Sequence, residues 1–425
     1  MATILRNIGA LATCRAAGRQ SEIHTIPVAA IVWEGGEILW IGPERDLPGA
    51  FADAERWDAG GRLVIPGLVD CHTHLAFGGD RADEFEQRCL GASYQSIALG
   101  GGGIAATVSA TRGTSEADLQ RRAAGYLREM VRLGVTTVEA KSGYGLNLDT
   151  ERKLLAVYRH LGQRQPVRIV PTFLGAHVVA PEYRDDRSGY VELIISEMIP
   201  SVAALGLAKF CDVFIEDGAF TIDEARRILL AGRRAGLQPK LHADQLAAGG
   251  GAELAAEIGA VSADHLEYIT EAGVEAIRAV GTVAVSLPLA TLYLKQTPMP
   301  ARRLMDAGVS VAVATDFNPG SAPNLHLPLA MTIACVLQGM SPAEALKGAT
   351  IIAARAVGAE DRVGSLEPGK AADFALIDAA DVNDWLYLFR PNACQLTVIA
   401  GEICWQSPGL DPSFGKNESL RTMIP

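Results

Sequence analysis

Two histidines one residue apart, His72 and His74, are the most chemically suggestive feature of this 425-residue sequence. They follow the turn signal Pro66-Gly67 in the run Val-Asp-Cys-His-Thr-His. On an extended strand alternate side chains share a face, so both imidazoles can bind one metal ion if other segments supply further ligands. The pair alone is equally consistent with two histidines on a half-buried strand. The rest of the chain must decide between these readings.

Alternating strand and helix patterns in the middle of the chain predict how further ligands are brought to this pair. Eight apolar, β-branched runs are each followed by a helical stretch rich in Ala, Leu, Arg and Glu. The runs are residues 68–72, 135–140, 167–174, 210–215, 239–242, 260–264, 282–287 and 309–315. Such alternation implies a parallel sheet, and eight units match an α/β fold of the (β/α)8 TIM-barrel type, with a doubly wound open sheet as the alternative.

Both ends of the chain have a different, β-like texture. Short candidate strands separated by glycine turns occupy residues 25–33, 37–41, 62–65, 373–378, 395–400 and 402–405. We therefore expect residues 1–65 and 362–425 to form one small composite β-sandwich domain from both termini. Residues 66–361 are then the barrel.

The carboxyl ends of the barrel strands carry the side chains able to do chemistry, and barrel active sites lie at these ends. Five of the eight histidines fall there, and a sixth, His326, follows the last strand. Three imidazoles and a carboxylate are a ligand set for Zn²⁺ or iron that leaves a position for water. The candidate ligands are His72, His74, His242 and Asp316. A metal at such a site makes hydroxide available near neutral pH, so we expect hydrolysis.

Asp316 and a further histidine at a strand end, His265, are expected to assist the reaction. Asp316 can take a proton from water and pass it to a leaving nitrogen. His265 is expected to hydrogen-bond a substrate carbonyl or Asp316. A second metal ion would need a bridging group such as a carbamylated lysine, but Lys141 lies on the second strand and Glu216 occupies the fourth. One metal ion is therefore favoured.

Composition excludes several classes of partner. A net charge of −11 argues against binding to nucleic acid or to an anionic membrane surface. The seven cysteines include no C-x-x-C pair, and no apolar run is long enough to cross a membrane. We therefore expect a cytoplasmic protein with reduced thiols and a small-molecule substrate.

Longer motifs around these residues resemble the amidohydrolase superfamily. Pro66-Gly67-Leu-Val-Asp-Cys-His-Thr-His74 and Gly364-Ser-Leu-Glu-Pro-Gly-Lys-Ala-Ala-Asp373 carry this resemblance. More specific runs resemble the imidazolonepropionase family and span nearly the whole chain. These runs are Phe77-Gly-Gly-Asp-Arg-Ala-Asp-Glu-Phe-Glu86, Gly100-Gly-Gly-Gly-Ile104, Glu139-Ala-Lys-Ser-Gly-Tyr-Gly-Leu146, Thr172-Phe-Leu-Gly-Ala-His177, Leu241-His-Ala-Asp-Gln245 and Asp316-Phe-Asn-Pro-Gly-Ser321.

The resemblance implies a reaction and a set of residue roles. The reaction is hydrolysis of the ring amide of 4-imidazolone-5-propanoate to N-formimidoyl-L-glutamate in histidine degradation, by a homodimer with one Zn²⁺ or iron ion per subunit. It implies the same four metal ligands as the strand ends do. The implied substrate contacts are Arg81, Tyr144, His177, Gln245, Asn318, Gly320 and Ser321.

The residue at position 245 bears on the choice between ring-amide hydrolysis and deamination. The resemblance implies that related deaminases, and some imidazolonepropionases, have Glu at this position. Because Gln cannot shuttle protons, Gln245 is expected to orient the substrate while Asp316 and His265 serve catalysis. A mononuclear deaminase acting on a nucleobase-like ring is the alternative, and it would release ammonia. A non-catalytic barrel that binds a metal or an imidazole would leave its open coordination position unused.

Overall fold

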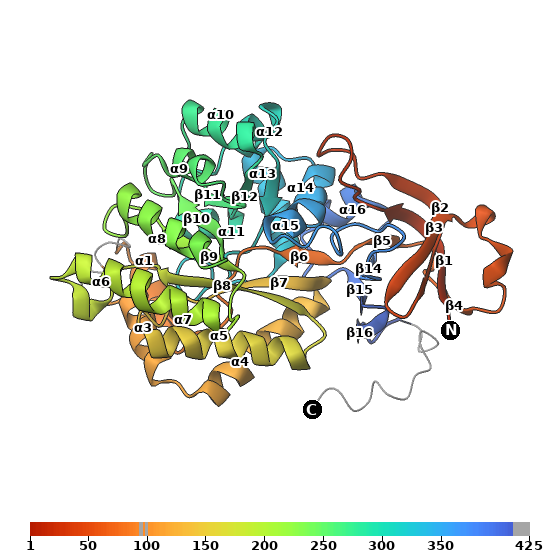
Figure 1. Cartoon of the computed structure of the whole chain (residues 1–425). Coiled ribbons are helices and arrows are strands. Elements are labelled where there is room, and N and C mark those ends of the chain that lie inside the picture. Colours follow the sequence, from red (N-terminus) through yellow and green to blue (C-terminus); the bar gives the residue numbers. More distant parts are fainter. Residues whose placement is uncertain (93–96, 98–100, 411–425) are drawn as a thin grey trace. The chain divides into compact units, whose positions relative to one another are not determined.

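The computed structural model covers the whole chain and describes residues 1–92, 97 and 101–410 (Figure 1). It divides into two compact units, one of Met1–Cys71, Arg128–Thr137 and His326–Pro425, the other of His72–Leu127 and Val138–Leu325. The domain boundaries expected from the sequence remain a prediction. Gly100 of the expected Gly100-to-Ile104 run, and residues 411–425 of the expected terminal domain, lie outside the described residues.

An eight-stranded sheet confirms the predicted barrel. Its order is β13-β12-β11-β10-β9-β8-β7-β6, and every pair from β8 to β13 is parallel. The strands are β6 Leu68–Asp70, β7 Val135–Lys141, β8 Arg168–Ala176, β9 Phe210–Phe214, β10 Gln238–Ala243, β11 Ser262–His265, β12 Val283–Ser286 and β13 Val311–Val313. Each of the eight expected runs overlaps one of them. Nearly every strand residue is buried, as expected for a parallel sheet covered on both faces.

Backbone contacts just beyond β6 and β13 bring the two edges of this sheet together. A parallel bridge joins Thr73 to Phe317. The amide of Asp316 donates to the carbonyl of His72 at 3.0 Å, and the amide of His74 donates to the carbonyl of Phe317 at 2.8 Å. This near-closure places the first and last strand ends side by side, which no local sequence pattern specifies.

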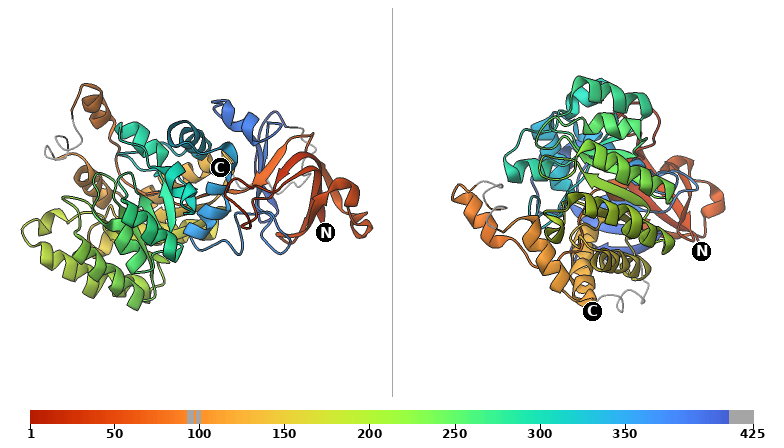
Figure 2. Two further views of the ribbon diagram at one scale, coloured as in Figure 1. Left: turned by 90° about the horizontal axis from the view of Figure 1, so that it is seen from above. Right: turned by 60° about the vertical axis from the view of Figure 1, so that its left-hand side comes forward.

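Between residues 138 and 325, helices connect successive strands and lie on the outside of the sheet (Figures 1 and 2), and further helices belong to the other unit. Helix α8 illustrates why they form: its N-cap Thr221 makes a capping box with Glu224, and Ile228 and Leu229 turn toward the core. None of the described helices is long and apolar enough to cross a membrane. The helices are α1 Ala82–Cys89, α3 Ile104–Gly113, α4 Glu116–Arg132, α5 Leu148–Arg164, α6 Arg187–Leu193, α7 Ile199–Ala204, α8 Ile222–Arg234, α9 Gly251–Glu257, α10 Glu271–Val280, α11 Pro288–Leu294, α12 Ala301–Asp306, α13 Leu327–Gln338, α14 Pro342–Gly348, α15 Ile351–Ala356 and α16 Val382–Tyr387.

A second sheet combines both ends of the chain, as predicted. Its strands are β1 Thr3–Ala12, β2 Thr25–Glu34, β3 Glu37–Pro43, β4 Glu55–Asp58, β5 Leu63–Pro66, β14 Phe374–Ile377, β15 Cys394–Ile399 and β16 Glu402–Gln406. Strand β14 pairs antiparallel with β5, which joins the two termini. Trp33, Trp57 and Phe374 pack edge to face in its core. Strand β1 is not among the expected runs because a register shift between Leu5 and Ile8 interrupts its alternation.

Candidate active site

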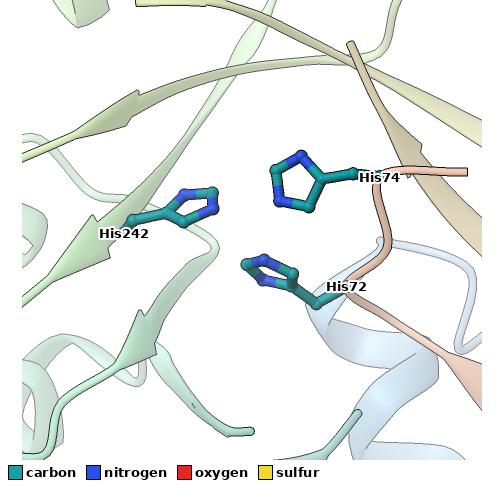
Figure 3. Close-up of side chains that lie close together, drawn as sticks. All are labelled: His72, His74 and His242. Atoms are coloured by element: carbon teal, nitrogen blue, oxygen red, sulfur yellow. The ribbon is translucent and has the colours of Figure 1, made fainter. Parts of the chain in front are cut away.

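Three imidazoles from two barrel strands surround a common point (Figure 3). His72 and His74 follow β6, and His242 lies in β10; one nitrogen of each lies within 4.8 Å of the others. Oδ1 of Asp316 is 3.4 Å from Nε2 of His72 and 3.6 Å from Nε2 of His74. The fold therefore brings together all four candidate ligands. None of the four is more than 3% exposed.

Two buried carboxylates hold two of these imidazoles. Nδ1 of His72 lies 2.6 Å from Oδ2 of Asp264, and Nδ1 of His242 lies 3.1 Å from Oδ1 of Asp212. A carboxylate accepts the Nδ1 proton, which leaves the Nε2 lone pair free to bind a metal. Among the described residues, Nε2 of both histidines is buried without a hydrogen-bond partner. Since buried polar atoms are normally paired, these two nitrogens fit a metal ion.

The electrostatic surroundings favour neutral imidazoles, the form that binds metal. Burial, followed by the positive charge of Lys141, lowers the pKa of His72 and His242 well below the usual value. Burial and then the neighbouring His177 lower the pKa of His74 in the same direction. Burial raises the pKa of Asp316 to about 6, against the opposing influence of His265.

Asp264 gives a testable consequence of this arrangement. We expect Asp264→Asn to weaken zinc binding by about 10- to 100-fold, because an amide no longer fixes the proton on Nδ1 of His72. Competition with a chromophoric chelator measures the dissociation constant. Asp186→Asn, which alters only the N-cap of α6, is the control and should bind zinc normally. Wild-type affinity in Asp264→Asn would contradict this role.

A charge cluster lies beneath the three histidines, and the sequence interpretation did not anticipate it. Nζ of Lys141 lies 2.6 Å from Oδ2 of Asp212, 3.2 Å from Oε1 of Glu139 and 3.3 Å from Oδ2 of Asp264. Nζ of Lys240 lies 2.8 Å from Oε2 of Glu139. All five side chains are fully buried. Lys141 ends the second barrel strand, as the sequence predicts, and its buried ammonium is the centre of this cluster. Charged residues inside apolar strand runs were the signal that could have revealed it.

A cavity of about 620 Å³ borders the histidines. It is lined by five of the seven expected substrate contacts and by His265, which the sequence reading assigned to catalysis. These residues are Tyr144, His177, Gln245, His265, Asn318 and Ser321. Phe214, Leu294 and Gln296 also line it and were not foreseen. Arg81 and Gly320 are not among the described residues that form the lining.

The loop after β13 shapes the surroundings of Asp316. Oγ of Ser321 donates to Oδ2 of Asp316 at 3.3 Å, and Nδ2 of Asn318 donates to Oγ of Ser321 at 2.8 Å. Oδ1 of Asn318 accepts the amides of Gly320 and Ser321, both at 2.8 Å. Asn318 and Ser321 therefore order this loop and the carboxylate as well as bordering the cavity.

The guanidinium of Arg81 lies next to Gly320 in this loop. Its Nε donates to Oγ1 of Thr107 at 2.8 Å, and its side chain is buried. A Cβ added at Gly320 would come within 2.1 Å of Nη1 of Arg81, so a side chain at this position would displace the guanidinium. His177 lies nearby: burial lowers its pKa to about 4, and its Nδ1 is 3.0 Å from the carbonyl of Gly143.

His326, the histidine that follows the last barrel strand in the sequence, has a structural role. It is the N-cap of α13, where its Nδ1 accepts the amide of Leu329 at 2.9 Å. Its Nε2 lies 2.7 Å from the carbonyl of Pro391. Both ring nitrogens are therefore used to hold backbone.

The chain is similar to known proteins over most of its length. The family model described as "Amidohydrolase family" matches residues 214–404. An imidazolonepropionase of Geobacillus thermodenitrificans is 48% identical over 91% of this chain and 92% of its own length. One from Myxococcus xanthus is 46% identical over 94% of this chain and 96% of its own. A zinc-bound adenosine deaminase from Xanthomonas campestris has a TM-score of 0.67 at 20% identity, covering 94% of this chain and 92% of its own, which indicates a shared fold.

Proposed function

The chain belongs to the imidazolonepropionase family of the amidohydrolases, and from this premise we propose how its barrel carries out the reaction. The protein is a hydrolase that opens the ring amide of 4-imidazolone-5-propanoate to give N-formimidoyl-L-glutamate in histidine degradation. The observation that carries the proposed site is that Nε2 of His72 and of His242 are buried with no hydrogen-bond partner among the described residues, and that Asp316 lies 3.4 Å from Nε2 of His72.

The proposed cofactor is one zinc or iron ion per subunit. The proposed ligands are His72, His74, His242 and Asp316. When bound, the ion supplies the Lewis acidity that activates water near neutral pH. A single ion is supported by Lys141, whose ammonium already compensates the carboxylates beneath the histidines.

Asp316 and His265 are the proposed catalytic residues. Asp316 accepts a proton from the attacking water and delivers it to the ring nitrogen as the carbon–nitrogen bond breaks. Ser321 orients this carboxylate by donating a hydrogen bond to its Oδ2. His265 lines the same cavity and exchanges a hydrogen bond with the reacting amide.

Further residues that line the cavity, together with Arg81 and Gly320 next to it, are proposed to hold the substrate. Tyr144 and His177 lie with ring centroids 5.4 Å apart and offer an aromatic wall to the planar imidazolone ring. Gln245 supplies an amide that can donate to and accept from the ring. Arg81 is the proposed partner of the propanoate, since a guanidinium matches a carboxylate. Asn318, Gly320 and Ser321 hold the loop between Arg81 and Asp316.

Gly320→Ala is expected to raise KM by about 10-fold or more, the value of one charged hydrogen bond, with a smaller change in kcat. The added methyl group meets Nη1 of Arg81 and displaces the guanidinium. Steady-state kinetics measures both constants. Gly49→Ala is the matched control, because its Cβ would meet nothing within 4 Å. An unchanged KM would remove Arg81 from the proposed substrate site.

The deaminase alternative predicts a different product. A deaminase releases ammonia, whereas ring-amide hydrolysis does not. The similarity to the solved adenosine deaminase, at 20% identity, shows only the fold. Gln245 also stands where a proton-shuttling Glu would favour deamination.

The decisive assay combines three measurements on purified protein. Loss of the ultraviolet absorbance of imidazolone propanoate follows turnover, an ammonia assay tests the alternative, and elemental analysis counts metal ions per chain. We expect turnover without ammonia in protein that holds one zinc or iron ion. Metal-loaded protein without turnover would defeat the proposed site.

We also propose a cytoplasmic homodimer. All seven cysteines lie within the described residues and are free thiols, which suits a reducing compartment. The dimer follows from the family resemblance. Light scattering should give twice the chain mass of 44.9 kDa.

A further inference from the structure

Two buried polar atoms beside the cavity face each other without hydrogen-bond partners. Nδ1 of His265 and Oε2 of Glu267 are 3.8 Å apart, and within the described part of the chain neither has another partner. The two residues are only 2% and 5% exposed. Because leaving buried polar atoms unsatisfied is costly, two complementary atoms kept at this separation indicate a functional pair.

The backbone between them is strained. His265 has φ 81° and Leu266 has φ 65°, both in the left-handed region that residues other than glycine rarely adopt. Such strain persists only where the surrounding structure imposes it, and it concentrates at functional sites. Here the strained turn at residues 265 and 266 brings the carboxylate of Glu267 back toward the ring of His265.

The other oxygen of Glu267 is anchored. Oε1 accepts the hydroxyl of Thr291 at 3.1 Å, and Thr291 lies in α11. The last residue of this helix, Leu294, and nearby Gln296 line the cavity. Glu267 therefore connects the ring of His265 to the helix that borders the substrate.

We propose that Glu267 is a positioning residue for His265. Its anchored carboxylate accepts the Nδ1 proton of His265, so that Nε2 faces the cavity with its lone pair and accepts the N–H of the reacting amide. The separation of 3.8 Å closes to a hydrogen bond when substrate fills the cavity, as catalytic hydrogen bonds tighten in the substrate complex. This inference rests on the proposed function, in which His265 contacts the substrate.

The test compares Glu267→Gln, His265→Asn and the double variant in the metal-loaded enzyme. We expect Glu267→Gln to lower kcat by about 10- to 100-fold, as losses of orienting partners do, with KM changed less than about twofold. The double variant should be no slower than His265→Asn, because Glu267 acts only through His265. A wild-type kcat in Glu267→Gln, or losses that multiply in the double variant, would overturn the inference.

Glu253→Gln is a matched control. Oε1 of Glu253 also accepts a threonine hydroxyl, from Thr270 at 2.7 Å, and its Oε2 is also buried without a partner. This variant should keep the wild-type kcat. If Glu267→Gln does not fold, Thr291→Val loosens the anchor instead; a lowered kcat that disappears in the His265→Asn background supports the inference, and an unchanged kcat refutes it.

Nitrogen-15 NMR of labelled histidine provides a readout independent of turnover. Nδ1 of His265 should be protonated in the wild-type complex with product, and this signal should be lost in Glu267→Gln. An identical spectrum would count against the pair. These variants also separate failure of the proposed function from failure of this inference. Full turnover in His265→Asn would remove His265 from the reaction. An impaired His265→Asn together with a normal Glu267→Gln would refute only the role of Glu267.

Discussion

Asp316→Asn is expected to lower kcat by about 100- to 10,000-fold, the usual contribution of a positioned acid or base. The carboxylate lies within 3.6 Å of Nε2 of both His72 and His74, and its second oxygen accepts the hydroxyl of Ser321. An amide keeps this shape but cannot take the proton of the attacking water. The absorbance assay, run on protein whose metal content has been measured, gives the rate.

Metal content separates the two roles of Asp316. Because Asp316 is also a proposed ligand, the rate must be compared at equal metal occupancy. Asp306→Asn, on the exposed end of α12, is the control and should leave both rate and occupancy unchanged. Full turnover of metal-loaded Asp316→Asn would refute its role in proton transfer.

Lys141→Met is expected to cost about 3–5 kcal/mol of the free energy of unfolding, the penalty for breaking a buried ion pair. Burial opposes the charge of Lys141, but Asp212, Glu139 and Asp264 outweigh it and raise its pKa. Without this ammonium, three buried carboxylates share only Lys240. Urea denaturation of the metal-free protein measures the loss, which keeps metal binding out of the comparison.

An exposed ion pair provides the control for Lys141→Met. Arg226 contacts Asp223 and Glu257 at the surface, where water screens the charges. Arg226→Met should therefore leave the urea midpoint nearly unchanged. A midpoint for Lys141→Met that matches this control would show that the buried cluster adds nothing to stability.

The sequence was sufficient to predict the barrel and the proposed ligands, because both depend on local patterns. Each barrel strand is a short apolar run before a helical stretch, and a strand end can be read without knowing its neighbours. Since all carboxyl ends of a barrel face the same way, His72, His242 and Asp316 could be grouped from their positions alone.

Only the tertiary structure decided which side chains hold these ligands in place. Asp264 is 192 residues from His72, and Asp212 is 71 residues from Lys141, so no local period relates the partners. The same applies to Arg81, whose space depends on the missing side chain of Gly320. His326, although close in sequence to the last strand, turns to cap α13.

The physical reason is that strands and their ends depend on one segment of the chain, whereas contacts between side chains depend on several segments at once. Periodicity and strand ends follow from the hydrophobic burial of one segment at a time, which the sequence encodes directly. Three other features depend on the near-closure of the barrel, where Thr73 meets Phe317. They are the orientation of the histidine rings, the compensation of the buried carboxylates and the space for the guanidinium of Arg81. The sequence patterns as a whole were therefore enough to propose His72 and His74 as metal ligands, whereas the contacts that Asp264 and Lys141 make beneath them were found only in the folded barrel.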